Sequence, residues 1–81
     1  MAKLVFYGRF ADFMGRERSI TIDGEKRLDA VIEELALANG AFADAVKARA
    51  VKFAINDEMA PNAAIVADSD EIAVLPPFSG G

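Results

Sequence analysis

The chain has 81 residues, enough for one small domain and too few for two hydrophobic cores. It contains no cysteine and no histidine, which excludes disulfides, thiolate nucleophiles and the usual zinc and iron–sulfur sites. The net charge is −4 and the nine basic residues are scattered along the chain, which argues against a nucleic-acid-binding protein.

Hydrophobic periodicity and turn residues predict a chain of short strands around two helices. The elements expected, in chain order, are a strand over residues 3–9, a short helix or turn over 10–15, a strand over 18–22, a helix over 28–39, a shorter helix over 41–49, a strand over 51–56, a short edge strand near 65–66 and a strand over 71–75. Residues 59–66 are ambiguous, because Pro61 argues against a central strand there.

The main helix has the clearest pattern. Its apolar residues follow the spacing of one helical face: Leu28, Val31, Ile32 and Leu35. Asn39-Gly40 supplies a plausible stop. In the first and last strands, alternation sends Leu4, Phe6, Ile72 and Val74 toward this helix.

Two leading strands joined as a hairpin, a helix across the sheet and returning strands together predict a β-grasp, or ubiquitin-like, fold. We expect an α+β domain over residues 1–75, with a mixed sheet of four to five strands, one main helix and one short helix. Residues 76–81 are expected to form a flexible tail.

That tail carries most of the functional signal. Pro76 and Pro77 have fixed φ angles, so they would project the tail stiffly from the domain. Gly80 and Gly81 carry no side chain, so the terminus is thin enough for a narrow tunnel in another protein. The terminal Gly-Gly alone is weak evidence, since chains also end in glycine by chance.

The combination of this pattern with Pro-Pro-aromatic and Gly-Gly resembles the ubiquitin-like sulfur carriers of molybdenum-cofactor and thiamine synthesis, the MoaD/ThiS-type family. The nearest resemblance is to the small subunit of molybdopterin synthase. It covers nearly the whole chain and is most specific over residues 68–81, where Ser79 supplies the hydroxyl residue that normally precedes the two glycines.

The resemblance implies a sulfur carrier in molybdopterin biosynthesis. An adenylyltransferase that resembles ubiquitin-activating enzymes would use Mg-ATP to adenylate the Gly81 carboxylate, and a persulfide donor would convert it to a thiocarboxylate. The large subunit would bind the tail (Pro76, Pro77, Phe78, Ser79, Gly80) and transfer the sulfur to cyclic pyranopterin monophosphate. This chain would then be the non-catalytic subunit of a heterotetramer, without a bound cofactor or metal.

Strand parity places Val5, Tyr7, Ala73 and Leu75 on the open face of the sheet, joined by Met59 across it. We expect Tyr7, Val5, Met59 and Leu75 to form a partner interface beside the tail, since exposed apolar patches often mark such sites. The alternative is that these residues only cover a sheet face, or that the parity is shifted by one.

Other assignments remain open. The chain could be a thiamine-pathway carrier, or a ubiquitin-like interaction module or protein modifier without sulfur chemistry. A stand-alone enzyme is the weakest alternative, because no base accompanies the Tyr7 hydroxyl. Asp68, Asp70 and Glu71 lack the spacing of a calcium loop and are expected to be a solvated turn. With no membrane-spanning run and no secretion signal, a cytoplasmic location is expected.

Overall fold

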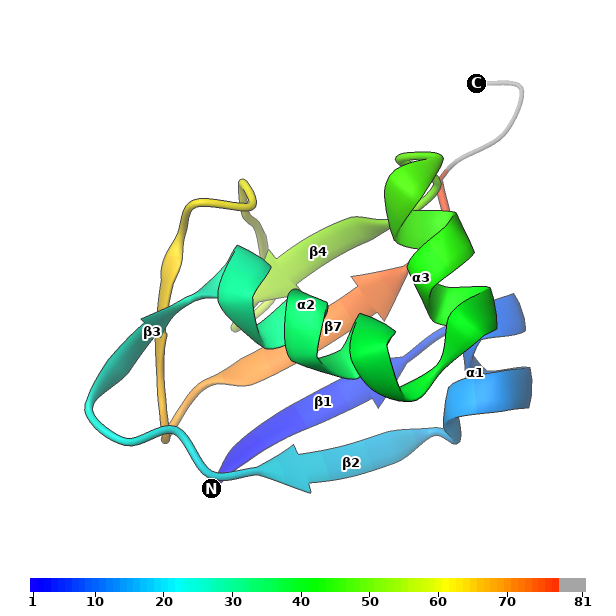
Figure 1. Cartoon of the computed structure of the whole chain (residues 1–81). Coiled ribbons are helices and arrows are strands. Elements are labelled where there is room, and N and C mark those ends of the chain that lie inside the picture. Colours follow the sequence, from blue (N-terminus) through cyan, green and yellow to red (C-terminus); the bar gives the residue numbers. More distant parts are fainter. Residues whose placement is uncertain (78–81) are drawn as a thin grey trace.

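A computed structural model describes residues 1–77 of the chain, and residues 78–81 lie outside the described part. Figure 1 shows a curved sheet with two longer helices across one face. The elements are β1 (Ala2–Phe6), α1 (Arg9–Met14), β2 (Glu17–Ile20), β3 (Glu25–Arg27), α2 (Leu28–Ala38), α3 (Gly40–Lys47), β4 (Lys52–Ile55), β5 (Glu58–Met59), β6 (Ile65–Ala67) and β7 (Glu71–Leu75).

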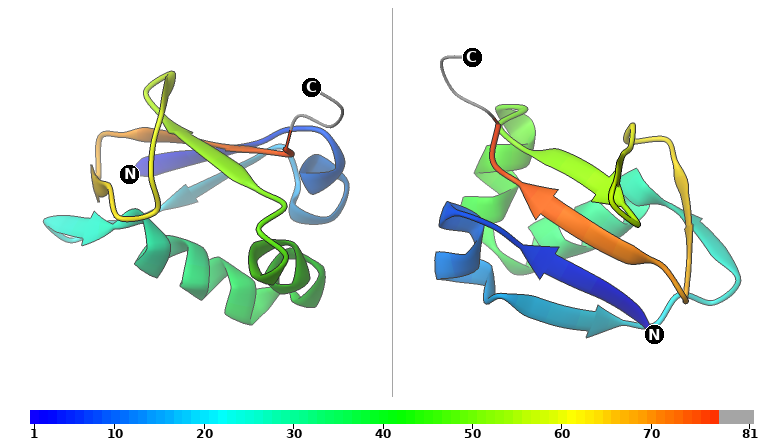
Figure 2. Two further views of the ribbon diagram at one scale, coloured as in Figure 1. Left: turned by 90° about the horizontal axis from the view of Figure 1, so that it is seen from above. Right: turned by 180° about the vertical axis from the view of Figure 1, so that it is seen from behind.

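The main sheet has five strands in the order β2-β1-β7-β4-β5. Strands β1 and β7 are parallel neighbours at its centre, while the other pairs in this sheet are antiparallel. A separate two-stranded sheet joins β3 to β6. Seen from above and from behind, α2 and α3 lie on one side of the main sheet and leave its other face open (Figure 2). The predicted β-grasp, ubiquitin-like fold is confirmed.

The core lies between the helices and the covered face of the sheet. The ring of Phe42 on α3 packs edge-on against Phe6 of β1 and Phe10 of α1, with centroids 6.4 Å and 5.9 Å away. All three side chains are buried. Because such aromatic pairs gain energy beyond their buried area, they join α1 and α3 firmly to β1. This cluster fixes the end of the sheet from which the tail leaves.

Helix α2 buries the face that its spacing predicts, with Leu28, Val31, Ile32 and Leu35 in the core. Arg27 stands at its N-cap and provides no side-chain cap. Helix α3 begins more firmly, because Asn39 Oδ1 accepts a hydrogen bond from the Phe42 backbone N–H at 3.0 Å.

Several predicted boundaries were wrong. Strand β1 ends at Phe6 instead of residue 9, because Gly8 turns the chain into α1. Strand β2 ends at Ile20 instead of residue 22; Ile22 is buried but donates its N–H to the Asp68 carboxylate. Strands β3 and β5 were not predicted, and both are too short to show a period.

Candidate functional site

The base of the tail follows the central strand of the main sheet. Strand β7 lies between β1 and β4 and ends at Leu75, so Pro76 and Pro77 emerge from the best-supported strand of the domain. Both prolines are half-buried. The predicted site residues Phe78, Ser79, Gly80 and Gly81 lie outside the described residues, and their roles stay predictions.

Gly8 forms one wall of the tail base. It has φ 57° and ψ −137°, the first central position of a type II′ turn, and the Phe10 N–H closes that turn onto the Tyr7 carbonyl at 3.2 Å. A Cβ added to Gly8 would lie 3.0 Å from Cγ of Pro76. Glycine is therefore favoured at this position for two reasons: the backbone angles suit it, and the Pro76 ring leaves little room for a Cβ.

The open face of the sheet is ordered by the strand register. One row across it consists of Glu17, Val5, Ala73, Ala54 and Met59. In the next row Leu75 lies opposite Lys52, and Tyr7 lies beside this pair because its N–H donates to the Val74 carbonyl at 3.0 Å. The predicted strand parity is therefore confirmed by the register.

The four residues expected to form an interface lie on this one face. Tyr7 is 46% exposed and Met59 is 59% exposed, while Val5 and Leu75 are half-buried. Tyr7 and Leu75 lie next to the tail base, and Val5 lies one row further along the sheet. In that row Met59 lies across Ala73 and the buried Ala54. We call this set, with the two alanines, the apolar band. Sequence reasoning missed Ala54, which lies between two core-facing residues.

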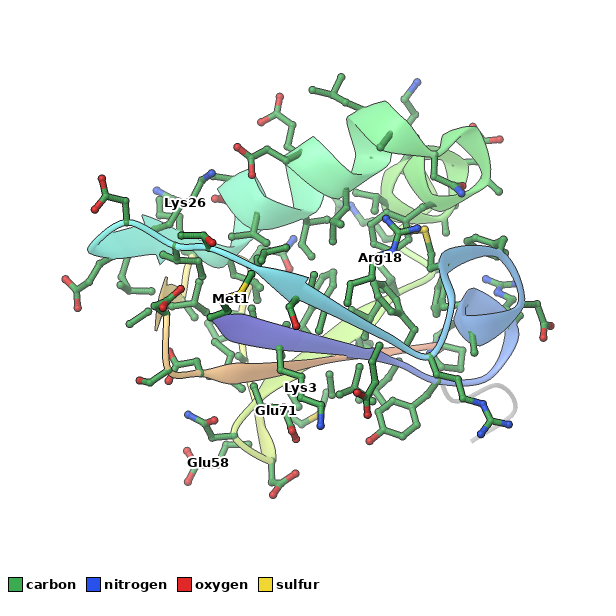
Figure 3. The ribbon with its side chains drawn as sticks, turned by 90° about the horizontal axis from the view of Figure 1, so that it is seen from below. Met1, Lys3, Arg18, Lys26, Glu58 and Glu71 are labelled. Atoms are coloured by element: carbon green, nitrogen blue, oxygen red, sulfur yellow. The ribbon has the colours of Figure 1, made fainter. Side chains whose placement is uncertain are left out.

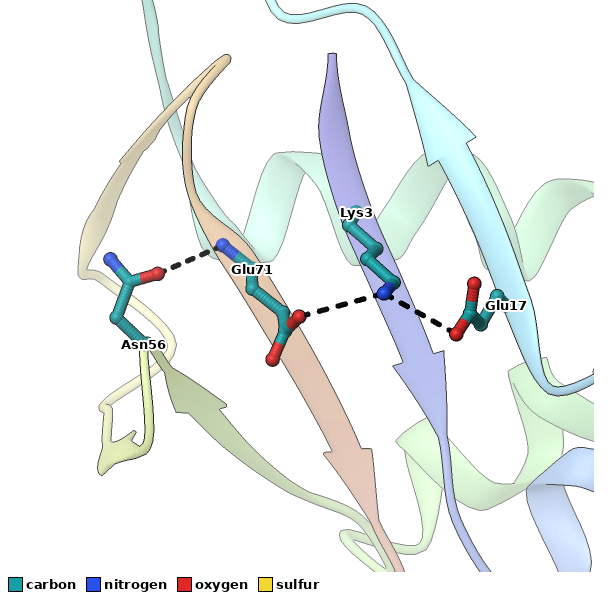
Figure 4. A network of polar contacts seen from close by, with 4 residues as sticks. All are labelled: Lys3, Glu17, Asn56 and Glu71. Carbon is teal, nitrogen blue, oxygen red and sulfur yellow. Dashed lines mark hydrogen bonds and ion pairs between the residues drawn. The ribbon is translucent and has the colours of Figure 1, made fainter.

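Charged residues border the apolar band toward the start of β7. Lys3 Nζ lies 3.3 Å from the Glu17 carboxylate and 3.9 Å from that of Glu71. The Asn56 side-chain oxygen accepts the Glu71 N–H at 3.0 Å (Figure 4). Figure 3 shows Lys3, Glu58 and Glu71 on the side of the sheet away from the helices. The band therefore has a polar rim, as partner surfaces commonly do.

The turn before β7 is structural. Asp68 accepts hydrogen bonds from the Ile22 N–H, and its carboxylate lies 3.0 Å from the N-terminal ammonium; the pKa of Asp68 is lowered by these contacts, with the Ile22 bond first. The Ala67 N–H and the Asn56 amide lower the pKa of Asp70 in the same way. Within residues 1–77, no three carboxylates come together as a metal site.

Among residues 1–77, the candidate site is an apolar surface on the open face of the sheet, beside the base of the tail. The Tyr7 hydroxyl has no hydrogen-bonded base among residues 1–77. No helix in that range is long and apolar enough to cross a membrane. Such a surface is suited to contact with a partner protein.

Comparisons with known proteins agree with this arrangement. The chain matches the family model described as the ThiS family over residues 4–81. A Pyrococcus furiosus structure, provisionally assigned as molybdopterin converting factor, subunit 1, superimposes with a TM-score of 0.81 at 23% identity, covering 95% of this chain and 97% of that one. SAMP1 from Haloferax volcanii gives a TM-score of 0.75 at 23% identity, covering 99% and 98%. The chain belongs to the ThiS family of ubiquitin-fold sulfur carriers.

Proposed function

We propose that this chain is the sulfur carrier of molybdenum-cofactor biosynthesis and that the Gly81 carboxylate is the group that carries sulfur. The observation that carries the proposal is the family match, which extends through the last residue and so includes Gly80 and Gly81. The position of β7 supports it, because a central strand gives the tail a fixed origin. The structural likeness to the Pyrococcus protein favours the molybdenum pathway.

The first step activates a poor electrophile. A carboxylate would have to expel oxide, so the Gly81 oxygen instead attacks the α-phosphate of ATP, releasing pyrophosphate and forming an acyl-adenylate. The partner adenylyltransferase supplies the Mg-ATP. The terminal sulfur of a persulfide then attacks the acyl carbon and AMP leaves. A thiol breaks the resulting S–S bond and releases the Gly81 thiocarboxylate.

The second step transfers the sulfur. In the large subunit, the thiocarboxylate sulfur attacks a carbon of cyclic pyranopterin monophosphate and a carbon–oxygen bond at that carbon breaks, the oxygen leaving with a proton. Water then cleaves the acyl–sulfur bond. This returns the Gly81 carboxylate and leaves sulfur on the acceptor; a second carrier supplies the second sulfur of the dithiolene. Side chains that move protons belong to the large subunit, so this chain acts as a co-substrate of a cytoplasmic heterotetramer.

The described residues contribute position and affinity. The contact between Gly8 and Pro76 sets the direction in which the tail begins. Tyr7, Leu75 and the rest of the apolar band dock against the large subunit, and against the activating enzyme in the earlier step. Using one face for both partners makes the two complexes mutually exclusive, so the carrier must dissociate between loading and delivery.

The test is the intact mass of the chain after incubation with the activating enzyme, Mg-ATP and a persulfide donor. We expect an increase equal to the replacement of one oxygen by sulfur, localised to the C-terminal peptide. A chain lacking Gly81 should show no increase while its circular dichroism is unchanged. An unmodified mass with an activating enzyme that loads another carrier would refute the proposal.

A second function is favoured by one observation. A Haloferax volcanii structure named small archaeal modifier protein 1 shares the fold, with a TM-score of 0.72 at 19% identity. The same adenylated Gly81 could acylate a lysine amine, with AMP leaving, and so modify proteins. Isopeptide-linked adducts in place of the sulfur-containing mass would favour this role. Sulfur transfer to a thiamine precursor, without transfer to pyranopterin, would identify the thiamine-pathway carrier instead.

A further inference from the structure

Basic side chains surround the base of the tail. Lys52 lies opposite Leu75, and Arg9 follows Gly8, the residue in contact with Pro76. The Arg16 carbonyl accepts the Phe6 N–H at the end of β1. Arg49 lines the same surface groove as Lys52, where α3 leads into β4. We call Arg9, Arg16, Arg49 and Lys52 the basic collar; all four are exposed.

Three of the five basic residues outside the collar are ion-paired, whereas Arg18, Lys47 and the collar residues form no ion pair within residues 1–77. Away from the tail base, Lys3, Lys26 and Arg27 each lie within 4.0 Å of a carboxylate. Among the ion pairs within residues 1–77, none involves a collar residue. The Arg9 guanidinium carbon lies 5.5 Å from the centre of the Phe10 ring, a cation–π contact. The collar charges are therefore available to a partner.

The opposite end of the sheet is acidic. Strands β1 and β7 begin there and β4 ends there, so their flanking turns share that pole. Its carboxylates are Asp23, Glu25, Asp57, Glu58, Asp68, Asp70 and Glu71. Four of the nine basic residues thus lie at the end of the sheet opposite these seven carboxylates, although Asp12 and Glu17 line the same surface groove as Arg16. Such polarity orients a protein as it approaches a charged partner.

Arg49 occupies a position that favours glycine. It follows Ala48, the C-cap of α3, and has φ 57°. The Ala50 N–H donates to the Ala45 carbonyl at 2.9 Å, and the Arg49 N–H donates to the Val46 carbonyl at 3.1 Å. This is the Schellman arrangement, in which the left-handed residue is usually glycine. An arginine there strains the backbone while keeping a charge beside the tail.

We propose that the basic collar docks on acidic side chains around the opening through which a partner protein receives the tail. This rests on the proposed function and names the chemistry of the partner surface. The collar residues are spread over two surface grooves and the start of α1, with Arg49 and Lys52 in one groove and Arg16 in the other. That spread fits carboxylates distributed around an opening, whereas a single phosphate group needs convergent donors.

The test uses the full chain and its activating enzyme, with two variants of equal net charge. Arg49→Gln/Lys52→Gln removes two collar charges, and Lys26→Gln/Arg27→Gln removes two charges elsewhere. We expect the collar variant to associate about 10-fold more slowly at low ionic strength, with the difference vanishing in high salt. The control should stay within about twofold of the unmodified chain. Equal slowing in both variants would overturn the proposal.

Arg49→Gly gives a second test with opposite signs. Relief of the left-handed strain should raise Tm by about 4 °C while association slows. Arg49→Lys should restore the association rate without raising Tm. The collar proposal would be overturned if Arg49→Gly associated with the activating enzyme at the normal rate. It would also be overturned if this variant changed the KM for ATP while its association rate stayed normal.

The two proposals fail separately. At saturating activating enzyme, the collar variants should form thiocarboxylate at the kcat of the unmodified chain. If the unmodified chain gains no sulfur, the proposed carrier function is wrong. The association rates would still show whether the collar contributes to docking. If sulfur loading is normal and association is insensitive to the collar, only the collar fails.

Discussion

Gly8 combines a backbone requirement with a contact to the tail. Gly8→Ala introduces a Cβ at φ 57° and only 3.0 Å from the Pro76 ring. We expect a loss of about 2 kcal/mol in the free energy of unfolding, from backbone strain at positive φ and from overpacking together. Urea unfolding measures it. The rate of Gly81 adenylation should also fall, because Pro76 must shift and redirect the tail.

Gly24 is the matched control for this substitution. It has φ +73° and open space where a Cβ would be added, so Gly24→Ala introduces a side chain at positive φ without a clash. We expect about 1 kcal/mol of destabilisation there and unchanged adenylation. Equal losses at both glycines would show that the Pro76 contact contributes nothing.

Asp68 and Asp70 make the stability of the domain depend on acidity. Backbone N–H groups hold the pKa of both carboxyls below the ordinary 3.8, so their charged forms stabilise the folded state. This contribution is present above pH 3.8 and is lost as the pH falls through the lower, folded-state pKa values. Urea midpoints measured from pH 6 to pH 2 should therefore drop below about pH 4.

Asp68→Asn and Asp70→Asn should each flatten this acid-side decline, because an amide oxygen still accepts the backbone bond but no longer titrates. Asp44→Asn, on the exposed face of α3, serves as the control. A decline as steep in the double variant as in the unmodified chain would assign acid sensitivity to other carboxyls.

At the scale of elements, α3 depends on its cap. Asn39 accepts the Phe42 N–H at 3.0 Å and donates to the Phe13 carbonyl at 3.4 Å, so it joins α3 to α1. Asn39→Ala should cost about 1 kcal/mol in urea unfolding. Asn39→Asp keeps the acceptor and should recover most of that loss; a full loss in both would show that the Phe13 bond dominates.

The elements with a long apolar repeat were among those that the sequence predicted. Helix α2 and strand β7 could be located because their inward residues recur over several turns or pleats. Strands β3 and β5 have three and two residues and are held by partners distant in the sequence or by the left-handed turn at Asn56 and Asp57. Tertiary pairing, which no local pattern contains, decides such strands.

The residues of the candidate site also divide into those that the sequence could predict and those that depend on tertiary pairing. Val5, Tyr7 and Leu75 could be assigned to one face because strand parity is local. The proximity of Gly8 to Pro76 and the gathering of Arg9, Arg16, Arg49 and Lys52 depend on the parallel pairing of β1 with β7 and on how α3 enters β4. A glycine directly after an alternating strand was the one available signal of the turn.

For the molecule as a whole, we expect the basic collar and the apolar band to affect different stages of docking. Charge acts over roughly 8 Å at physiological salt and sets the rate of encounter. Burial of the apolar band acts only on contact and sets the lifetime of the complex. Collar substitutions should therefore change association and its salt dependence, and band substitutions should mainly change dissociation.

The band is tested by Tyr7→Asp and Leu75→Asp, measured as affinity for the proposed large-subunit partner. Burying a carboxylate in an apolar contact is costly, so each should weaken binding at least about 10-fold, mostly through faster dissociation. Leu37→Asp is the control, because Leu37 is 85% exposed on α2, away from the open face. Each variant should retain its circular dichroism spectrum. If both band variants bind as tightly as Leu37→Asp, the open face is not the partner surface, and docking must then depend on the tail and the collar.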